Sequence, residues 1–200
     1  STNDAVGNVI VGYQAGSDVT TGDKNTAIGF ETGNAITSGD NNTFVGALAG
    51  DAINTANDNT AIGYGSLTTA QTASGSVAIG LDAGGTITTG NRNIAIGYDA
   101  LNGAATTGDN NVAIGVSAGD ALTSGKNNVA IGKDAFTRAA AANEIIAIGN
   151  NAAGQNTVTT GADGTVAIGF FALGDLSSGA NNVAIGYEAL RAEDANSENT

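Results

Sequence analysis

The sequence lacks five residue types that carry much of protein chemistry. Cysteine, histidine, methionine, tryptophan and proline are all absent from its 200 residues. Without cysteine and histidine the chain lacks most of the usual transition-metal ligands and the commonest general base, although Asp and Glu remain available. Serines such as Ser66 and Ser117 have no histidine to activate them as nucleophiles. These absences predict that the protein is not an enzyme.

Positive charge and large side chains are also scarce. Six Lys and Arg stand against 19 Asp and Glu, so the formal net charge of −13 would repel nucleic acid and anionic membranes. We therefore expect no nucleic-acid partner. No apolar run reaches the roughly 20 residues of a membrane-spanning helix, so we also expect no direct membrane insertion. Aromatic residues make up 4% of the chain and 31 residues are glycine. This composition favours a thin, elongated core over a compact globule.

One short phrase recurs along the whole chain. Versions of GDNNVAIG, the sequence of residues 108–115, occur eleven times. We call the glycine that closes each copy the reference glycine of one coil. Successive reference glycines lie 17 residues apart, except for one interval of 18 and one of 20, and small insertions between intact copies are typical of a solenoid. The reference glycines are Gly12, Gly29, Gly46, Gly63, Gly80, Gly97, Gly115, Gly132, Gly149, Gly169 and Gly186.

The residues just before each reference glycine predict a short β-strand. Val or Ile stands one position before it, and Val, Ile or Thr three positions before it, in every copy. Branching at Cβ favours extended backbone, and residues two apart in a strand share one face. We interpret this face as the interior of the coil. The expected core ladder is Val11, Ile28, Val45, Ile62, Ile79, Ile96, Ile114, Ile131, Ile148, Ile168 and Ile185.

The opposite face of the same strand carries Ala in nine copies, with Ile10 and Phe44 as the exceptions, and is never polar. A strand with one side in water alternates apolar with polar residues, so this strand is expected to be covered on both sides. A chain so poor in large side chains would gain stability by associating with copies of itself. The expected inter-chain face is Ala27, Ala61, Ala78, Ala95, Ala113, Ala130, Ala147, Ala167 and Ala184.

Asparagine stands four positions before the reference glycine in eight copies. In stacked coils such amides can hydrogen-bond to one another and to turn backbone, which predicts a ladder; a recognition surface is the alternative. The expected ladder is Asn8, Asn25, Asn42, Asn59, Asn93, Asn111, Asn128 and Asn182.

Two other recurring features bear on ligand binding. Aspartates at the turn before the strand, such as Asp23 and Asp109, suggest calcium between coils, but another copy has Lys126 at the same position. A lysine is incompatible with an obligatory cation site, so we expect no metal and no cofactor. Seven copies carry a Ser/Thr-Ser/Thr-Gly triplet, such as Thr20-Thr21-Gly22, which is typical of a turn. Its aligned hydroxyls also suggest an ice-binding surface, although some copies lack the triplet.

The segments NNVAIG, SVAIG (residues 76–80) and NTAIG (residues 25–29) carry a resemblance, as do Tyr98 to Leu101 and Tyr187 to Leu190. The chain resembles the head repeats of YadA-like trimeric autotransporter adhesins and the similar AIG repeats of phage tail fibres. The resemblance covers residues 6–200. It implies a homotrimer of parallel β-rolls, left-handed in the adhesin heads, and no catalytic residues. The 17-residue coil is longer than the coil of those heads, so the resemblance does not define the shape of the outer half of each coil.

We therefore expect an all-β protein, a parallel β-solenoid (β-roll) of about eleven 17-residue coils that is continuous over residues 1–200. The missing Met at position 1, and a Glu198-Asn199-Thr200 end that matches the start of another copy, predict a fragment of a longer repeat array. The expected function is a rigid, multivalent fibre segment of a cell surface or virion tail fibre. Its expected partners are copies of itself and a host-surface receptor or glycan. The alternatives are a self-assembling extracellular filament subunit and an ice- or mineral-binding solenoid.

Overall fold

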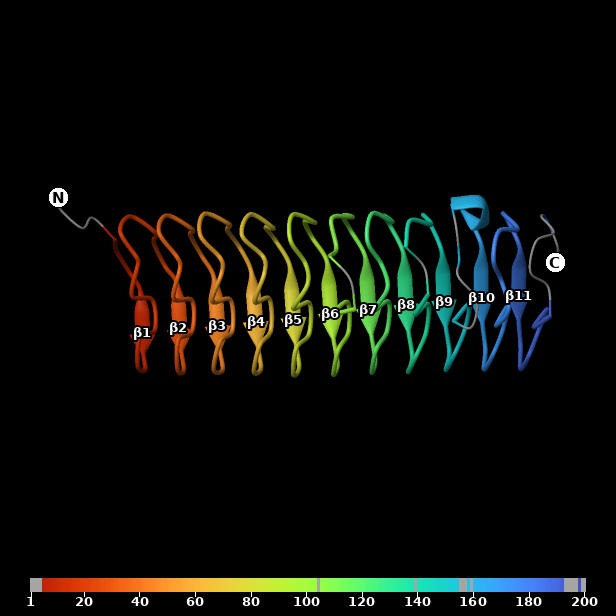
Figure 1. Ribbon diagram of the computed structural model, residues 1–200, viewed down its shortest axis with the longest axis horizontal. Helices are drawn as coiled ribbons and strands as arrows, with labels where there is room; N and C mark the ends of the chain where they lie inside the picture. The colour runs from red at the N-terminus through yellow and green to blue at the C-terminus, as the bar shows by residue number, and fades with distance from the viewer. Residues whose placement is uncertain are drawn as a thin grey trace.

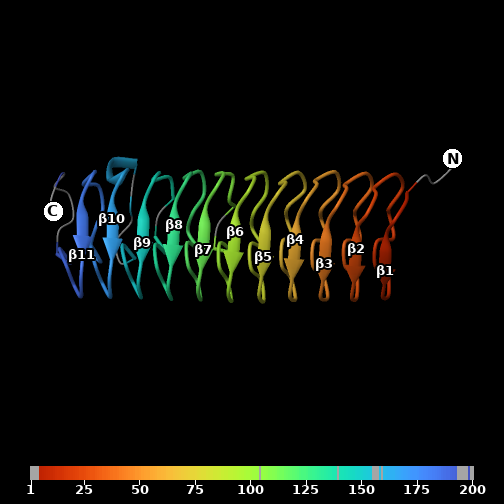
Figure 2. The same ribbon diagram turned by 180° about the vertical axis from the view of Figure 1, so that it is seen from behind.

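The computed structural model is a solenoid with one short strand in each coil, and β1 and β11 lie at opposite ends of a rod (Figures 1 and 2). It describes residues 5–103, 105–138, 140–154, 158, 160–192 and 198. Asn199 and Thr200, the rest of the expected further copy, lie outside these residues. Beside the strands there is one short 3₁₀ helix, η1 (Thr160–Ala162). The strands are β1 (Val9–Val11), β2 (Thr26–Ile28), β3 (Thr43–Val45), β4 (Thr60–Ile62), β5 (Val77–Ile79), β6 (Ile94–Ile96), β7 (Val112–Ile114), β8 (Val129–Ile131), β9 (Ile146–Ile148), β10 (Val166–Ile168) and β11 (Val183–Ile185).

The strands form a single parallel sheet in chain order from β1 to β11, which confirms the expected parallel β-solenoid. Each residue pairs with its equivalent in the next coil, so that Ala95 lies beside Ala113. The coils with extra residues keep this register, because the insertions fall outside the strands: Ile146 still pairs with Val166 across the interval of 20. With strands spaced about 4.8 Å apart, ten steps give a rod roughly 48 Å long.

Each strand ends at its reference glycine because the backbone there adopts a conformation that side chains oppose. Gly97 has φ +128°, and a Cβ at this residue would lie 2.6 Å from the carbonyl oxygen of Gly115 in the next coil. The glycines stack directly on one another, so a single methyl group would push two coils apart. The recurring glycine is therefore required by the close approach of the coils.

The coil turns its corners at residues in the left-handed region, which recur two and four positions after the reference glycine and five positions before it. In the coil of Gly97 these residues are Asp99, Leu101 and Arg92, with φ between +51° and +56°. Such a conformation costs a non-glycine residue about 1–2 kcal/mol. The repeat therefore accepts local strain in exchange for a tight coil.

The alanines of the strands point into the coil. Ala27, Ala95 and Ala147, like the other alanines at this position, are completely buried within the single chain, and Ala184 is 2% exposed. The Val and Ile residues beside them point outward, and Ile185 is 67% exposed. The expected assignment of the two faces is therefore wrong. The eleven residues from Val11 to Ile185 form an outer ladder, and the nine alanines from Ala27 to Ala184 form part of the core.

The physical reason for this reversal is the narrowness of the coil. Alanines that follow the reference glycine by three residues, such as Ala83 and Ala100, are also fully buried and face the strands across a thin interior. Under most strands there is room only for a methyl group. The exceptions are Ile10 and Phe44, which fit because glycines leave space for them. A Cβ at Gly16 would lie 2.7 Å from Ile10 Cδ1, and a Cβ at Gly33 or Gly50 would lie within 3.0 Å of the Phe44 ring.

The remaining core volume comes from two positions, four and seven residues after the reference glycine, which we call the inner pair. In five coils the first is Gly and the second is Val, Ile or Leu, as in Gly84 with Ile87, where a Cβ at Gly84 would lie 3.0 Å from Ile87 Cδ1. In the coil of β4 the order is reversed, and Leu67 stands with Ala70. Large and small residues thus compensate within one coil. The Gly-first inner pairs in the core are Gly33 with Ile36, Gly50 with Ile53, Gly84 with Ile87 and Gly119 with Leu122, whereas both members are large in Leu173 with Leu176.

Candidate functional site

The outward side of the sheet is a predominantly apolar surface, which we call the outer apolar face. It consists of three columns of equivalent residues, which stand three positions before, one position before and one position after the reference glycine of each coil. None of the 33 side chains in these columns is buried. Twenty-eight of them are apolar and none is acidic; the only charge is Lys133. The columns are Val9, Thr26, Thr43, Thr60, Val77, Ile94, Val112, Val129, Ile146, Val166, Val183; the outer ladder from Val11 to Ile185; and Tyr13, Phe30, Ala47, Tyr64, Leu81, Tyr98, Val116, Lys133, Asn150, Phe170, Tyr187.

The size of this face sets it apart from ordinary surface. The three columns are two residues apart along each strand, so they extend about 13 Å along the strands and about 48 Å along the rod, on the order of 650 Å². The largest apolar patch of a typical monomer is about 300–600 Å² and marks an interaction site in many proteins. The outer apolar face therefore has the dimensions of a binding surface.

Aromatic rings at both ends of this face stack on one another from coil to coil. Tyr13 and Phe30 lie with ring centroids 5.3 Å apart and an interplanar angle of 14°. Phe170 and Tyr187 repeat the arrangement at 5.3 Å and 11°. Tyr187 is nevertheless 73% exposed, so the stacked rings present wide apolar surface to solvent.

The eight asparagines of the expected ladder stand at the same position of their coils and take part in hydrogen bonds between coils. All of them are buried except Asn8, which is half-buried. Asn128 shows the pattern: its backbone N–H donates to Asn111 Oδ1 at 3.0 Å, and its Nδ2 donates to the same oxygen at 3.0 Å and to the Ala142 carbonyl at 2.8 Å. The Asn128 amide thus ties together three successive coils. Because buried polar groups are costly unless paired, these bonds hold the register of the stack.

Three coils have another residue at the ladder position. Ser76 continues the ladder, since its hydroxyl oxygen accepts the Asn93 N–H at 3.2 Å. Ile145 ends the first run: its N–H still donates to Asn128 Oδ1 at 3.0 Å, but its side chain offers no acceptor to the next coil. Thr165 begins the second run, where its hydroxyl oxygen accepts the Asn182 N–H at 3.4 Å.

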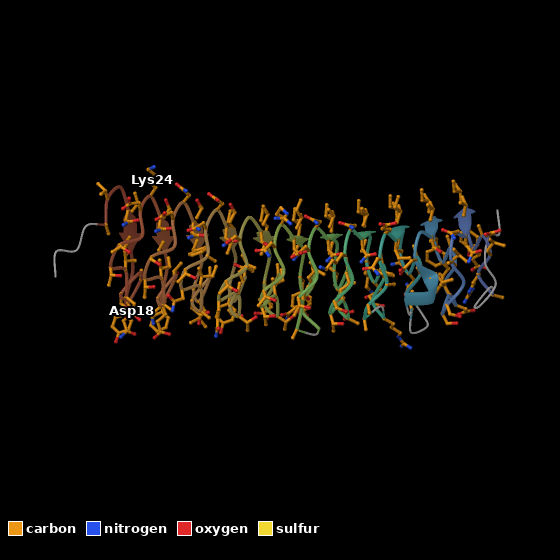
Figure 3. All side chains as sticks on the ribbon, turned by 90° about the horizontal axis from the view of Figure 1, so that it is seen from above. Asp18 and Lys24 are labelled. Carbon is orange, nitrogen blue, oxygen red and sulfur yellow. The ribbon has the colours of Figure 1, made fainter. Side chains whose placement is uncertain are left out.

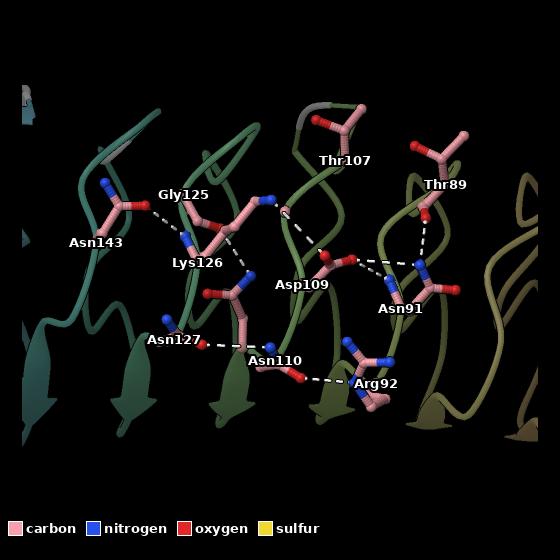
Figure 4. Close-up of polar contacts among 12 residues, drawn as sticks. Thr89, Asn91, Arg92, Thr107, Asp109, Asn110, Gly125, Lys126, Asn127 and Asn143 are labelled. Carbon is pink, nitrogen blue, oxygen red and sulfur yellow. Dashed lines mark hydrogen bonds and ion pairs between the residues drawn. The ribbon is translucent and has the colours of Figure 1, made fainter.

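A second ladder, not recognised in the sequence, lies two residues earlier in the coil. Here a side-chain oxygen accepts the backbone N–H of the equivalent residue in the preceding coil, as Asp109 Oδ1 does from Asn91 N at 2.8 Å (Figure 4). This bond, with smaller contributions from the Asn91 amide and Lys126, lowers the pKa of Asp109. The acceptors are Asp23, Asp40, Asn57, Ser74, Asn91, Asp109, Asn143 and Asp163.

The turn position considered for calcium is therefore a structural hydrogen-bonding position. Its mixture of Asp, Asn and Ser, which share a side-chain oxygen acceptor, was the available sequence signal. Lys126 replaces the acceptor in one coil, and its Nζ lies 3.7 Å from Asp109 Oδ2. Within the described part of the chain, no group of three or more acidic side chains is arranged to hold a metal ion.

Two carboxylates on another side of the coil are poorly satisfied. Asp51 and Asp120 occupy the same position in different coils, and in each the Oδ1 atom is buried with no hydrogen-bond partner among the described residues. Burial of the carboxyl group raises the pKa of both residues. Asn34 and Asn102 occupy this position in other coils, so the site accepts a neutral amide.

Comparison of the chain with protein-family models, with curated proteins and with solved structures gives no match. None of the helices in the described ranges is long and apolar enough to cross a membrane. The interpretation of function therefore depends on the surfaces and ladders described above.

Proposed function

We propose that the chain is a rigid, non-enzymatic rod segment of an extracellular fibre, on a cell surface or a virion tail, that associates through its outer apolar face into a trimer of parallel rods. The observation that carries the proposal is the outer apolar face itself, about 48 Å of Val, Ile and aromatic side chains without an acidic residue. In a chain of net charge −13, none of the 33 side chains of this face is acidic. A standard protein interface covers about 800 Å² of each partner, close to the area of this face.

The trimeric number, the parallel arrangement and a left-handed winding rest on the resemblance of the repeat to adhesin heads and tail fibres. The rod's stiffness has support in the two ladders, which tie successive coils together by hydrogen bonds that are buried in the asparagine ladder and partly buried in the second ladder. Three identical rods side by side would display every outward site three times. Such a fibre would act through length, stiffness and multivalent contact.

Sedimentation of the wild-type chain tests this proposal. The expected particle has about three times the chain mass of 19.3 kDa. Replacing two outward residues, Ile79→Asp with Ile96→Asp, places carboxylates in the outer apolar face and is expected to yield monomers. The matched control, Thr107→Asp with Ser124→Asp, adds the same charge at exposed positions outside that face and is expected to remain a trimer. A wild-type chain that is monomeric at tens of micromolar would overturn the proposal.

A further inference from the structure

The side of the rod away from the sheet carries a second surface. Viewed from above, Asp18 lies on the side opposite the strands (Figure 3). The equivalent residues of the next two coils are Ala35 and Ala52, and both line a hollow on this side. A partner that covers the outer apolar face would leave this side accessible.

Two adjoining hollows form a groove along the coils of β2 to β5. Their volumes are about 440 and 290 Å³, and they share Ala52, Gln71 and Thr72. We call them together the threonine groove, defined by the six residues Ala52, Asn54, Thr55, Gln71, Thr72 and Thr89. Four coils at the strand spacing give it a length of roughly 14–19 Å.

The threonine groove combines fixed and free polar groups. The hydroxyls of Thr68 and Thr69 at its edge both donate to the Gly85 carbonyl, at 3.1 and 2.7 Å, and are held in place. By contrast, the hydroxyl of Thr72 and the side-chain amide of Gln71 have no hydrogen-bond partner in the part of the chain that the structure describes, and both residues are exposed. Thr55 and Thr89 repeat the free hydroxyl in the neighbouring coils, one step of about 4.8 Å away.

Charge is absent from the lining of the threonine groove. None of the described residues that line the two hollows is charged, although the chain carries 25 charged residues in all, six basic and 19 acidic. Ionic ligands would find no opposite charge here. The groove offers methyl groups from Ala and Thr together with hydroxyl and amide groups that both donate and accept hydrogen bonds. A molecule with a rim of hydroxyls and apolar C–H faces matches this set.

We infer that the threonine groove binds a neutral oligosaccharide that lies along the rod axis. The inference rests on the proposed function, since it names the partner of the fibre's contact surface. A concave groove several coils long suits a short sugar chain better than a crystal surface. An ice lattice would need a flat array of equal side chains, and Asn54 and Gln71 interrupt the hydroxyls with longer amides.

Titration calorimetry with neutral pentasaccharides of glucose, mannose, galactose and N-acetylglucosamine tests the inference. At least one is expected to bind with a Kd in the micromolar to millimolar range, and a pentasaccharide of galacturonic acid is expected not to bind. The variant Gln71→Ala with Thr72→Val removes the free groups at the centre and is expected to weaken binding at least tenfold. The control Thr107→Val removes an exposed hydroxyl outside the groove and is expected to leave the Kd unchanged.

Binding to none of the neutral probes, or binding that the groove variant does not alter, would overturn the inference. Freezing-point hysteresis that the same variant abolishes would assign the groove to ice and would also overturn it. The oligomeric state is measured separately, by sedimentation of the same samples. If Ile79→Asp with Ile96→Asp is monomeric and still binds the sugar, the groove stands; if the wild type is monomeric and binds, only the trimer fails.

Discussion

The compensation within the inner pair predicts that a severe core mutation can be rescued from within the same coil. Leu67 is completely buried, and its partner Ala70 is small. Leu67→Gly empties this space, whereas Leu67→Gly with Ala70→Ile recreates the Gly and Ile arrangement of Gly84 and Ile87 in the next coil. The double variant is therefore expected to be much more stable than Leu67→Gly and at least as stable as Ala70→Ile.

The magnitudes follow from the structure. Truncation of a buried leucine to alanine costs about 2–5 kcal/mol. Removal of the last methyl adds about 0.8 kcal/mol, while glycine relieves about 1 kcal/mol of strain at the positive φ of +52°. Ala70→Ile alone overpacks the coil and costs about 1–3 kcal/mol. Because the new Ile fills the vacated space, we expect the double variant to lie within about 1.5 kcal/mol of wild type, with a favourable coupling of more than about 2 kcal/mol.

Urea denaturation followed by circular dichroism gives the free energy of unfolding of the four proteins in this cycle. Protein concentration must be equal in all four, since any association makes apparent stability depend on concentration. The compensation argument is refuted if the two substitutions are additive, or if the double variant is less stable than Leu67→Gly.

Three further predictions concern the glycine stack, the ladder and the strained carboxylates. Gly97→Ala, which drives a Cβ against a backbone carbonyl, is expected to lower the thermal midpoint far more than Gly75→Ala, whose Cβ has its nearest contact at 3.4 Å; equal midpoints would contradict the steric account. Asn111→Ala leaves a buried carbonyl and a buried N–H unpaired and should cost about 2–5 kcal/mol in urea unfolding, against less than about 1 kcal/mol for the exposed Asn127→Gly. The raised pKa of Asp120 means that the folded state binds its proton more tightly than the unfolded state, so its contribution to stability is lost as pH rises through the folded pKa. Asp120→Asn is therefore expected to raise the thermal midpoint at pH 7 and to leave it unchanged near pH 3. The corresponding gain in the free energy of unfolding is less than about 1 kcal/mol, because the group is partly hydrated. An equal gain at both pH values would rule out the carboxylate as its cause.

Much of the architecture could be predicted from the repeat. A constant interval places equivalent residues above one another, so the period led directly to parallel strands in register, and the insertions could be assigned to loops. The position of Asn111 relative to Gly115 was enough to predict a buried amide ladder, because identical side chains in stacked coils meet their own copies. The second ladder was missed, because Asp109 and Asn91 differ as residue types although both present the same oxygen acceptor.

The sequence by itself determined the period, the strand and its two faces, because side chains alternate along extended backbone. Only the tertiary structure decided which face lies inside. Ala95 and Ile96 are both apolar, so polarity could not separate them, and the larger residue was expected in the core. The opposite wall of the coil lies so close that only the methyl group of Ala95 fits beneath the strand, and Ile96 must point outward. Space inside a narrow coil, and not hydrophobicity, assigned the two faces of this protein.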